Sequence, residues 1–145
     1  MNLLQFILTT CLFVLMMLGH FVGDYLFQNN RMALNKSKRN KEGWYACGVH
    51  SFVYTLSIVI FLRLVFPALC FNLWVWAAIG IPHYIIDHYS LASYWMKWKN
   101  GVKPFESVSM DEKVTVETTI VNDNTIHWVM LYFTCMALVC YNLVR

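Results

Sequence analysis

Charged residues are scarce in this chain of 145 residues, of which Asp, Glu, Lys and Arg together form only 13%. An ordinary soluble domain has about twice that share, and it has less apolar material than the 59% found here. These two values exclude an ordinary soluble domain. The net charge of +3 does not indicate a nucleic-acid partner, because the basic residues are better explained by membrane topology.

Several motifs are also lacking. The sequence has no glycine-rich phosphate loop of the Walker or Rossmann type, which excludes nucleotide binding by those routes. It has no GxSxG nucleophile elbow and no CxxC pair. The five cysteines occur singly in or beside apolar segments, so we expect them to act as small hydrophobic side chains.

Long apolar stretches are what the chain does have. Four of them, at 3–27, 44–69, 71–95 and 120–144, are long enough to cross the ~30 Å hydrocarbon core of a bilayer as helices. The first has no Lys or Arg ahead of it and is too long for a removable signal peptide. The sequence therefore predicts an all-α membrane protein, a single domain over 1–145 that forms a four-transmembrane-helix up-down bundle.

The basic residues predict the orientation of this bundle. Nine of the eleven Lys and Arg residues lie in or beside the two connections at 28–43 and 96–119, and only Arg63 and Arg145 lie elsewhere. Because basic loops stay in the cytoplasm, both connections are expected there and both termini on the non-cytoplasmic side.

Polar pairs interrupt the apolar stretches at four places. They are His20 with Asp24, His50 with Tyr54, His83 with Asp87, and Asp123 with His127; Gln28 lies one turn after Asp24, and His88 follows Asp87. A spacing of four places both members of a pair on one helical face. The pairs lie at the end of the first helix, the start of the second, the end of the third and the start of the fourth. In an up-down bundle these four ends share the cytoplasmic side, so one polar layer is expected.

Imidazole and carboxylate groups are common ligands of zinc, manganese and iron. The candidate ligands of a divalent metal are His20, Asp24, His50, His83, Asp87, Asp123 and His127, and of these Asp24, Asp87 and Asp123 are also candidate catalytic carboxylates. This set is large enough for one ion with orienting partners or for two ions about 3.5–4 Å apart, an arrangement that suits phosphoester chemistry. Gln28, Tyr54 and His88 are candidates for groups that orient the ligands.

Other interpretations of the same residues stay open. The His–Asp pairs could hold the helices together or relay protons, and Asp123 could cap a helix. The first basic connection could be a solvated anchor, or it could bind anionic head groups, with the candidates Arg31, Asn35, Lys36, Lys38 and Arg39.

The ordered motifs H20-x3-D24, M32-A-L-N35-K36, H50-x3-Y54, H83-x3-D87 and D123-x3-H127 resemble a small bacterial and phage membrane-protein family of unknown function. That family is similar to predicted inner-membrane metal-dependent hydrolases. Two positions depart from its pattern: Asn124 stands where glutamine is more usual, and His88 stands where an aromatic residue is more usual. Asn124 keeps the amide and is a further candidate orienting group, while His88 could be an extra ligand.

The resemblance implies a polytopic protein of the bacterial inner membrane. The first hypothesis is an intramembrane metal-dependent hydrolase, with its site near the cytoplasmic face, that acts on an anionic amphiphile, lipid-like or phosphorylated. The alternative is a non-enzymatic membrane interaction protein or a proton or ion relay, such as a phage-encoded protein that acts on the host envelope. Membrane lipids are the expected partners under both hypotheses.

Overall fold

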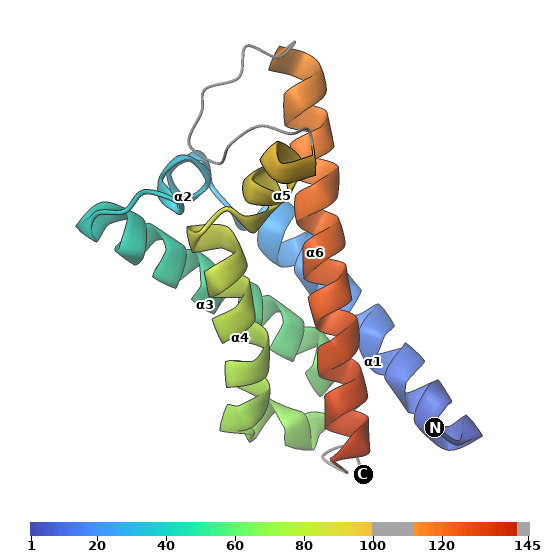
Figure 1. The fold of residues 1–145 in the computed structure, drawn as a ribbon. Coiled ribbons are helices and arrows are strands. Elements are labelled where there is room, and N and C mark those ends of the chain that lie inside the picture. The colour runs from blue at the N-terminus through green and yellow to red at the C-terminus, as the bar shows by residue number, and fades with distance from the viewer. Residues whose placement is uncertain (100–111, 142–145) are drawn as a thin grey trace.

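A computed structural model describes residues 1–99 and 112–141, with side chains from 119 onward in the second range. All regular elements of these residues are helical, as the sequence predicts (Figure 1). They are α1 (Leu3–Phe21), the π-helical turn η1 (Val22–Leu26), α2 (Asn30–Asn35), α3 (Lys41–Arg63), the 3₁₀-helix η2 (Pro67–Phe71), α4 (Leu73–His88), α5 (Leu91–Lys99) and α6 (Glu112–Cys140).

Four long helices form the body of the molecule. α1 packs against α3 and α6, and α4 also packs against both of these helices. α1 and α4 run toward the end that carries the short helices α2 and α5, while α3 and α6 run away from it (Figure 1). The end of α1, the middle of α3 and the end of α4 therefore lie near one another.

The helix boundaries differ from the expected ones at several places. The helix expected over 44–69 ends at Arg63 and is followed by η2, and the helix expected from 120 begins at Glu112, inside the expected connection 96–119. The range 71–95, expected as one helix, forms α4 and α5, because Ser90 adopts a φ of 50° and turns the chain out of the α4 axis. The range 3–27 changes from α to π geometry at Val22. The connection 28–43 contains α2, whose start is capped by the side chain of Asn29. The side chain of Asn40 caps α3, which therefore begins at Lys41 and not at the expected residue 44.

Two glycines set the distance between α1 and α3. A Cβ atom on Gly19 would collide with the backbone of Ile58, and one on Gly23 would lie 3.0 Å from the Cα of Tyr54. Small residues spaced four apart permit such close helix packing. The approach brings His20 and Asp24, which neighbour these glycines, against the middle of α3, where they meet Tyr54 and His50.

Polar and apolar side chains are distributed in the reverse of the usual soluble pattern. The four histidines at 20, 50, 83 and 127 are fully buried, whereas Leu3, Phe6 and Leu26 are more than half exposed. Two helical segments, Leu3–Leu26 with a mean hydropathy of 2.1 and Lys41–Arg63 with 1.7, are long and apolar enough to cross a membrane. This finding rests on length and composition alone.

Candidate metal centre

The structure brings all seven predicted ligands together at the α2/α5 end of the bundle. They come from every long helix: His20 from α1, Asp24 from η1, His50 from α3, His83 and Asp87 from α4, and Asp123 and His127 from α6. The side chain of Asp87 is only 1% exposed, while that of Asp123 is 31% exposed. The centre is thus buried on one side and open on the other.

A first group of atoms surrounds Nε2 of His50. This nitrogen lies 3.0 Å from Oδ2 of Asp87, 3.2 Å from Oδ1 of Asp24 and 3.1 Å from Nε2 of His83. One ring nitrogen has at most one proton to donate, so it cannot satisfy all three neighbours. Oδ1 of Asp24 is buried and makes no hydrogen bond, although two imidazole nitrogens lie within 3.9 Å of it. Several lone pairs directed at one small volume are what a cation requires.

A second group lies on the other side of the Asp87 carboxylate. Oδ1 of Asp87 lies 3.3 Å from Nε2 of His127, and that nitrogen lies 3.7 Å from Oδ2 of Asp123. Among the described residues, three sets of three have ligand atoms within 4.8 Å of one another. His50, His83 and Asp87 belong to the first group, Asp87, Asp123 and His127 form the second, and Asp24, His83 and His127 form a third set between them. Asp87 therefore contributes Oδ2 to the first group and Oδ1 to the second, so its carboxylate could hold an ion on either side.

Lys36 enters the centre from the C-terminal cap of α2. Its Nζ atom donates to Oδ2 of Asp87 over 2.9 Å. Burial alone would lower the pKa of Lys36, but the charge of Asp87 and this hydrogen bond outweigh that effect and raise it. With the three carboxylates ionised and the imidazoles neutral, Lys36 leaves the centre with a charge of −2, which favours the binding of divalent cations.

The two ring nitrogens of His20 both lie close to other side chains of the protein and not to a group of ligand atoms. Its Nε2 lies 2.8 Å from Oδ1 of Asn124, and its Nδ1 lies 3.2 Å from both the Tyr54 hydroxyl and Oδ2 of Asp24. Nδ2 of Asn124 donates to the Ile120 carbonyl, which turns the amide oxygen toward His20. Among the described residues, no group with ligand geometry includes His20. In the structure this predicted ligand therefore contacts Asp24, Tyr54 and Asn124, and it is placed to orient the Asp24 carboxylate.

The predicted orienting residues separate into those that contact the centre and one that does not. The ring of Tyr54 stacks on His83 with 3.5 Å between centroids, and Nε2 of Gln28 lies 3.1 Å from Nε2 of His50. His88 points elsewhere: its Nδ1 lies 3.0 Å from the Lys36 carbonyl, and its ring packs on Trp44. His88 therefore contacts the end of α2, and it is not part of the sets of ligand atoms among the described residues.

The model of a family described as "Protein of unknown function (DUF3307)" matches residues 12–143, which include every predicted site residue. The chain belongs to the DUF3307 family. No curated protein and no solved structure matches it. The expectation of an uncharacterised family is confirmed, and membership in DUF3307 assigns no reaction.

The head-group candidates of this DUF3307 protein are dispersed around the α2 segment. Nη2 of Arg31 lies 3.7 Å from Oε1 of Glu42, and the buried Asn35 donates to the Arg31 carbonyl. The side chain of Lys36 enters the centre, whereas Lys38 is exposed. The guanidinium carbon of Arg39 lies 5.5 Å from the centroid of the Tyr89 ring. The entry of Lys36 was not foreseen, because nothing in the spacing of a basic connection shows which lysine folds inward.

A cavity of about 350 Å³ connects the candidate metal centre with the surface. Its wall includes Lys36, Asp87 and Asp123 together with Ser90 and Ser93, which lie at and beyond the break between α4 and α5. The break at Ser90 therefore helps to form the opening. A molecule in this cavity would meet the ammonium group and both ligand groups.

Proposed function

We propose that this protein is an integral membrane hydrolase that depends on divalent metal ions and acts on an anionic amphiphile. The observation that carries the proposal is the Asp87 carboxylate, which places one oxygen in each of two His/Asp groups. Structural pairing alone would need one partner for each polar atom. Here the polar atoms outnumber the protons available to join them.

We extend the proposed membrane spans from the two apolar helical segments described above to all four long helices. The apolar exterior and polar interior support four spans in the bacterial inner membrane, with the α2 and α5 connections in the cytoplasm and both termini outside. Tryptophans at 95 and 98 and lysines at 97 and 99 fit a helix α5 that lies at the membrane–water interface. The centre is then near the cytoplasmic face.

Zinc, manganese or iron would suit the donor set, with His50, His83 and Asp87 holding one ion and Asp87, Asp123 and His127 holding another. A bound ion would supply Lewis-acid polarisation and a water of lowered pKa. Asp123 also lines the cavity, so one of its carboxylate oxygens would hold the ion while the other would be placed to take a proton from water. The oxygen of water would bond to the electrophilic centre as the bond to the leaving oxygen breaks. The proton would then pass to that oxygen.

The first test is elemental analysis of protein purified in detergent without metal-affinity resin or chelator. We expect up to two equivalents of metal in the wild type and a loss of both in Asp87→Asn, which keeps the size of the side chain and removes its charge. Glu42→Gln is the matched control, because Glu42 is an acidic residue outside both groups. Metal-free wild-type protein that is folded, or equal metal in both variants, would refute the proposal.

A proton relay is the second candidate, and a row of imidazoles favours it. Nε2 of His83 lies 3.1 Å from Nε2 of His50, and its Nδ1 lies 3.3 Å from Nδ1 of His127. Neutral imidazoles in such a row can pass a proton along alternating tautomers. A relay would fail in Asp87→Asn while holding no metal in the wild type, so the same analysis separates the two candidates.

A further inference from the structure

Lys36 is a cationic side chain in the wall of the cavity over the metal centre, and it is largely buried there. Its side chain is 18% exposed, and its Nζ atom donates to Oδ2 of Asp87 over 2.9 Å. Oδ2 is also the oxygen that Asp87 contributes to the first group of ligand atoms. An ion held by that group would therefore compete with the ammonium of Lys36 for the same oxygen.

The other carboxylates near Lys36 do not offer it a replacement partner. Asp24 and Asp123 lie close enough for their charges to act on Lys36, but both also belong to sets of ligand atoms. Ions in the centre would attract all three carboxylates. Because a buried ammonium without an anion is strongly destabilised, Lys36 would then need an anionic oxygen from outside the protein.

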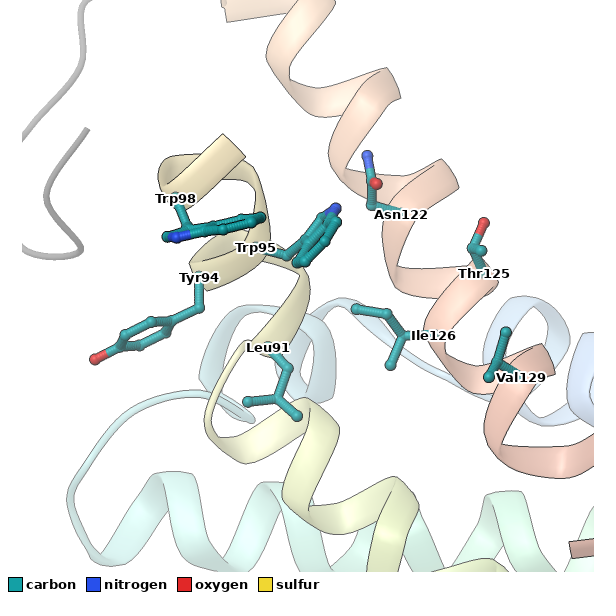
Figure 2. A pocket seen from close by; sticks show the side chains of 8 residues that line it. All are labelled: Leu91, Tyr94, Trp95, Trp98, Asn122, Thr125, Ile126 and Val129. Carbon is teal, nitrogen blue, oxygen red and sulfur yellow. The ribbon is translucent and has the colours of Figure 1, made fainter. Parts of the chain in front are cut away.

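The cavity over the centre has other polar groups that suit such an oxygen. Its wall includes Ser37, Ser90 and Ser93, and each hydroxyl can donate a hydrogen bond. A second and larger cavity, the groove between α5 and α6, has a different character. Figure 2 shows Trp95 of α5 facing Ile126 of α6 there, and the surface of this groove is almost entirely apolar. Of these two cavities, the one over the centre is therefore expected to take an anionic group.

The charge of the centre indicates which kind of anion fits. Without metal the centre carries a charge of −2 and should repel anions, whereas two divalent ions would change this charge to +2. A phosphate monoester carries a charge of about −2 near pH 7, and a phosphate diester carries a charge of about −1. The monoester is the one that balances the centre when both ions are bound.

We propose that the substrate of this centre is a phosphate monoester, and that Lys36 exchanges Asp87 for a phosphate oxygen of this substrate when the metal ions bind. The identity of the substrate as a monoester rests on the proposed function. Hydrolysis would form a bond from the oxygen of water to phosphorus and break the bond from phosphorus to the ester oxygen. One proton of water would pass to that ester oxygen and the other would stay with the phosphate, which gives an alcohol and inorganic phosphate.

The test is isothermal titration calorimetry with methyl phosphate, a monoester, and dimethyl phosphate, a diester. It uses full-length protein in detergent that is loaded with manganese, and elemental analysis gives the metal content of each sample. We expect the wild type to bind methyl phosphate at least about tenfold more tightly than dimethyl phosphate, because the diester lacks one charged oxygen. Chelator-treated protein should bind neither ester, since its centre is anionic.

The variant Lys36→Met removes the ammonium, and we expect it to weaken the binding of methyl phosphate by about 10–100-fold while manganese stays bound. Lys36→Arg keeps a cation at this position and should lose less affinity. Lys38→Met is the matched control, because Lys38 is exposed and is not among the described residues that line the cavity. A lysine that only stabilises the fold would leave the affinity of the folded, metal-loaded protein for methyl phosphate unchanged.

A second measurement needs no variant. If manganese favours the binding of methyl phosphate, methyl phosphate must raise the affinity of the wild type for manganese by the same factor. An unchanged affinity for manganese would overturn the exchange at Lys36, even if Lys36→Met does not fold.

The outcomes separate this inference from the proposed function. Metal-loaded wild type that binds both esters equally, or equal affinities in Lys36→Met and Lys38→Met, would overturn the monoester site and leave the metal-dependent hydrolase standing. Folded wild type without metal would refute both.

A short-chain phosphatidic acid, which is a lipid monoester, identifies the source of the phosphate. Tighter binding of this lipid than of methyl phosphate would support the monoester site and assign the phosphate to a lipid head group. Equal binding would also support the monoester site, but it would contradict the amphiphilic substrate of the proposed function.

Discussion

The two ends of the helical bundle are built from the same long helices but are held together differently. Toward the N-terminus of α1 the interior is apolar, and Leu12, Ile58 and Leu131 are fully buried in it. At the α2/α5 end the fully buried residues are histidines, with carboxylates beside them. The apolar end needs only shape and volume to pack. The polar end needs protons or a cation to balance its charges, and its His/Asp clusters could hold a metal ion.

The largest expected effect is a difference in metal affinity between variants of two histidines at the polar end. His83→Gln removes a predicted ligand, and we expect metal affinity to fall by more than about 100-fold, the upper limit for losing an orienting partner. His20→Gln removes such a partner, which should cost about 10–100-fold. Competition with a metal-sensitive dye measures both. Equal losses in the two variants would contradict the distinction between them.

The spacing of the polar pairs was enough to predict that they converge in one layer, since this follows from helical periodicity and an up-down order. The layer lies near the middle of α3 and α6 and not at their starts, because α3 begins at Lys41 and α6 at Glu112. It was not enough to separate His20 from His83, because both stand four residues before an aspartate. Their difference arises from Asn124 and Tyr54, which reach His20 from other helices. The break at Ser90 was likewise not foreseen, because serine is not a residue that usually marks a positive φ.

A second prediction concerns the contact of α1 and α3 that joins the two ends. Gly19→Ala places a methyl group against the Ile58 backbone, and we expect a loss of about 1–3 kcal/mol in unfolding free energy. Gly48→Ala is the matched control: it lies in α3 with no neighbour within 4 Å of the added carbon, so a gain of up to about 1 kcal/mol is expected. Reversible unfolding in mixed micelles measures both. A gain in both variants would show that the close packing is not required.

The smallest expected effect tests how Lys36 and a metal ion share Asp87. Lys36→Met removes a cation that competes for Oδ2 of Asp87, so we expect zinc affinity to rise by about tenfold, or about 1.4 kcal/mol. The same variant should be less stable than wild type in chelator, because Asp87 then lacks its ammonium partner. The exposed Lys38→Met is the control. Unchanged zinc affinity in Lys36→Met would show that Lys36 and the metal do not compete for Oδ2 of Asp87.

The bridging role of Asp87 is tested most directly by electron paramagnetic resonance of the manganese-loaded protein in detergent. Two ions that share the Asp87 carboxylate should give an exchange-coupled spectrum at two equivalents, and Asp87→Asn should abolish it. A spectrum of isolated ions at every loading, or protein that binds neither manganese nor zinc, would contradict a bridged two-metal centre.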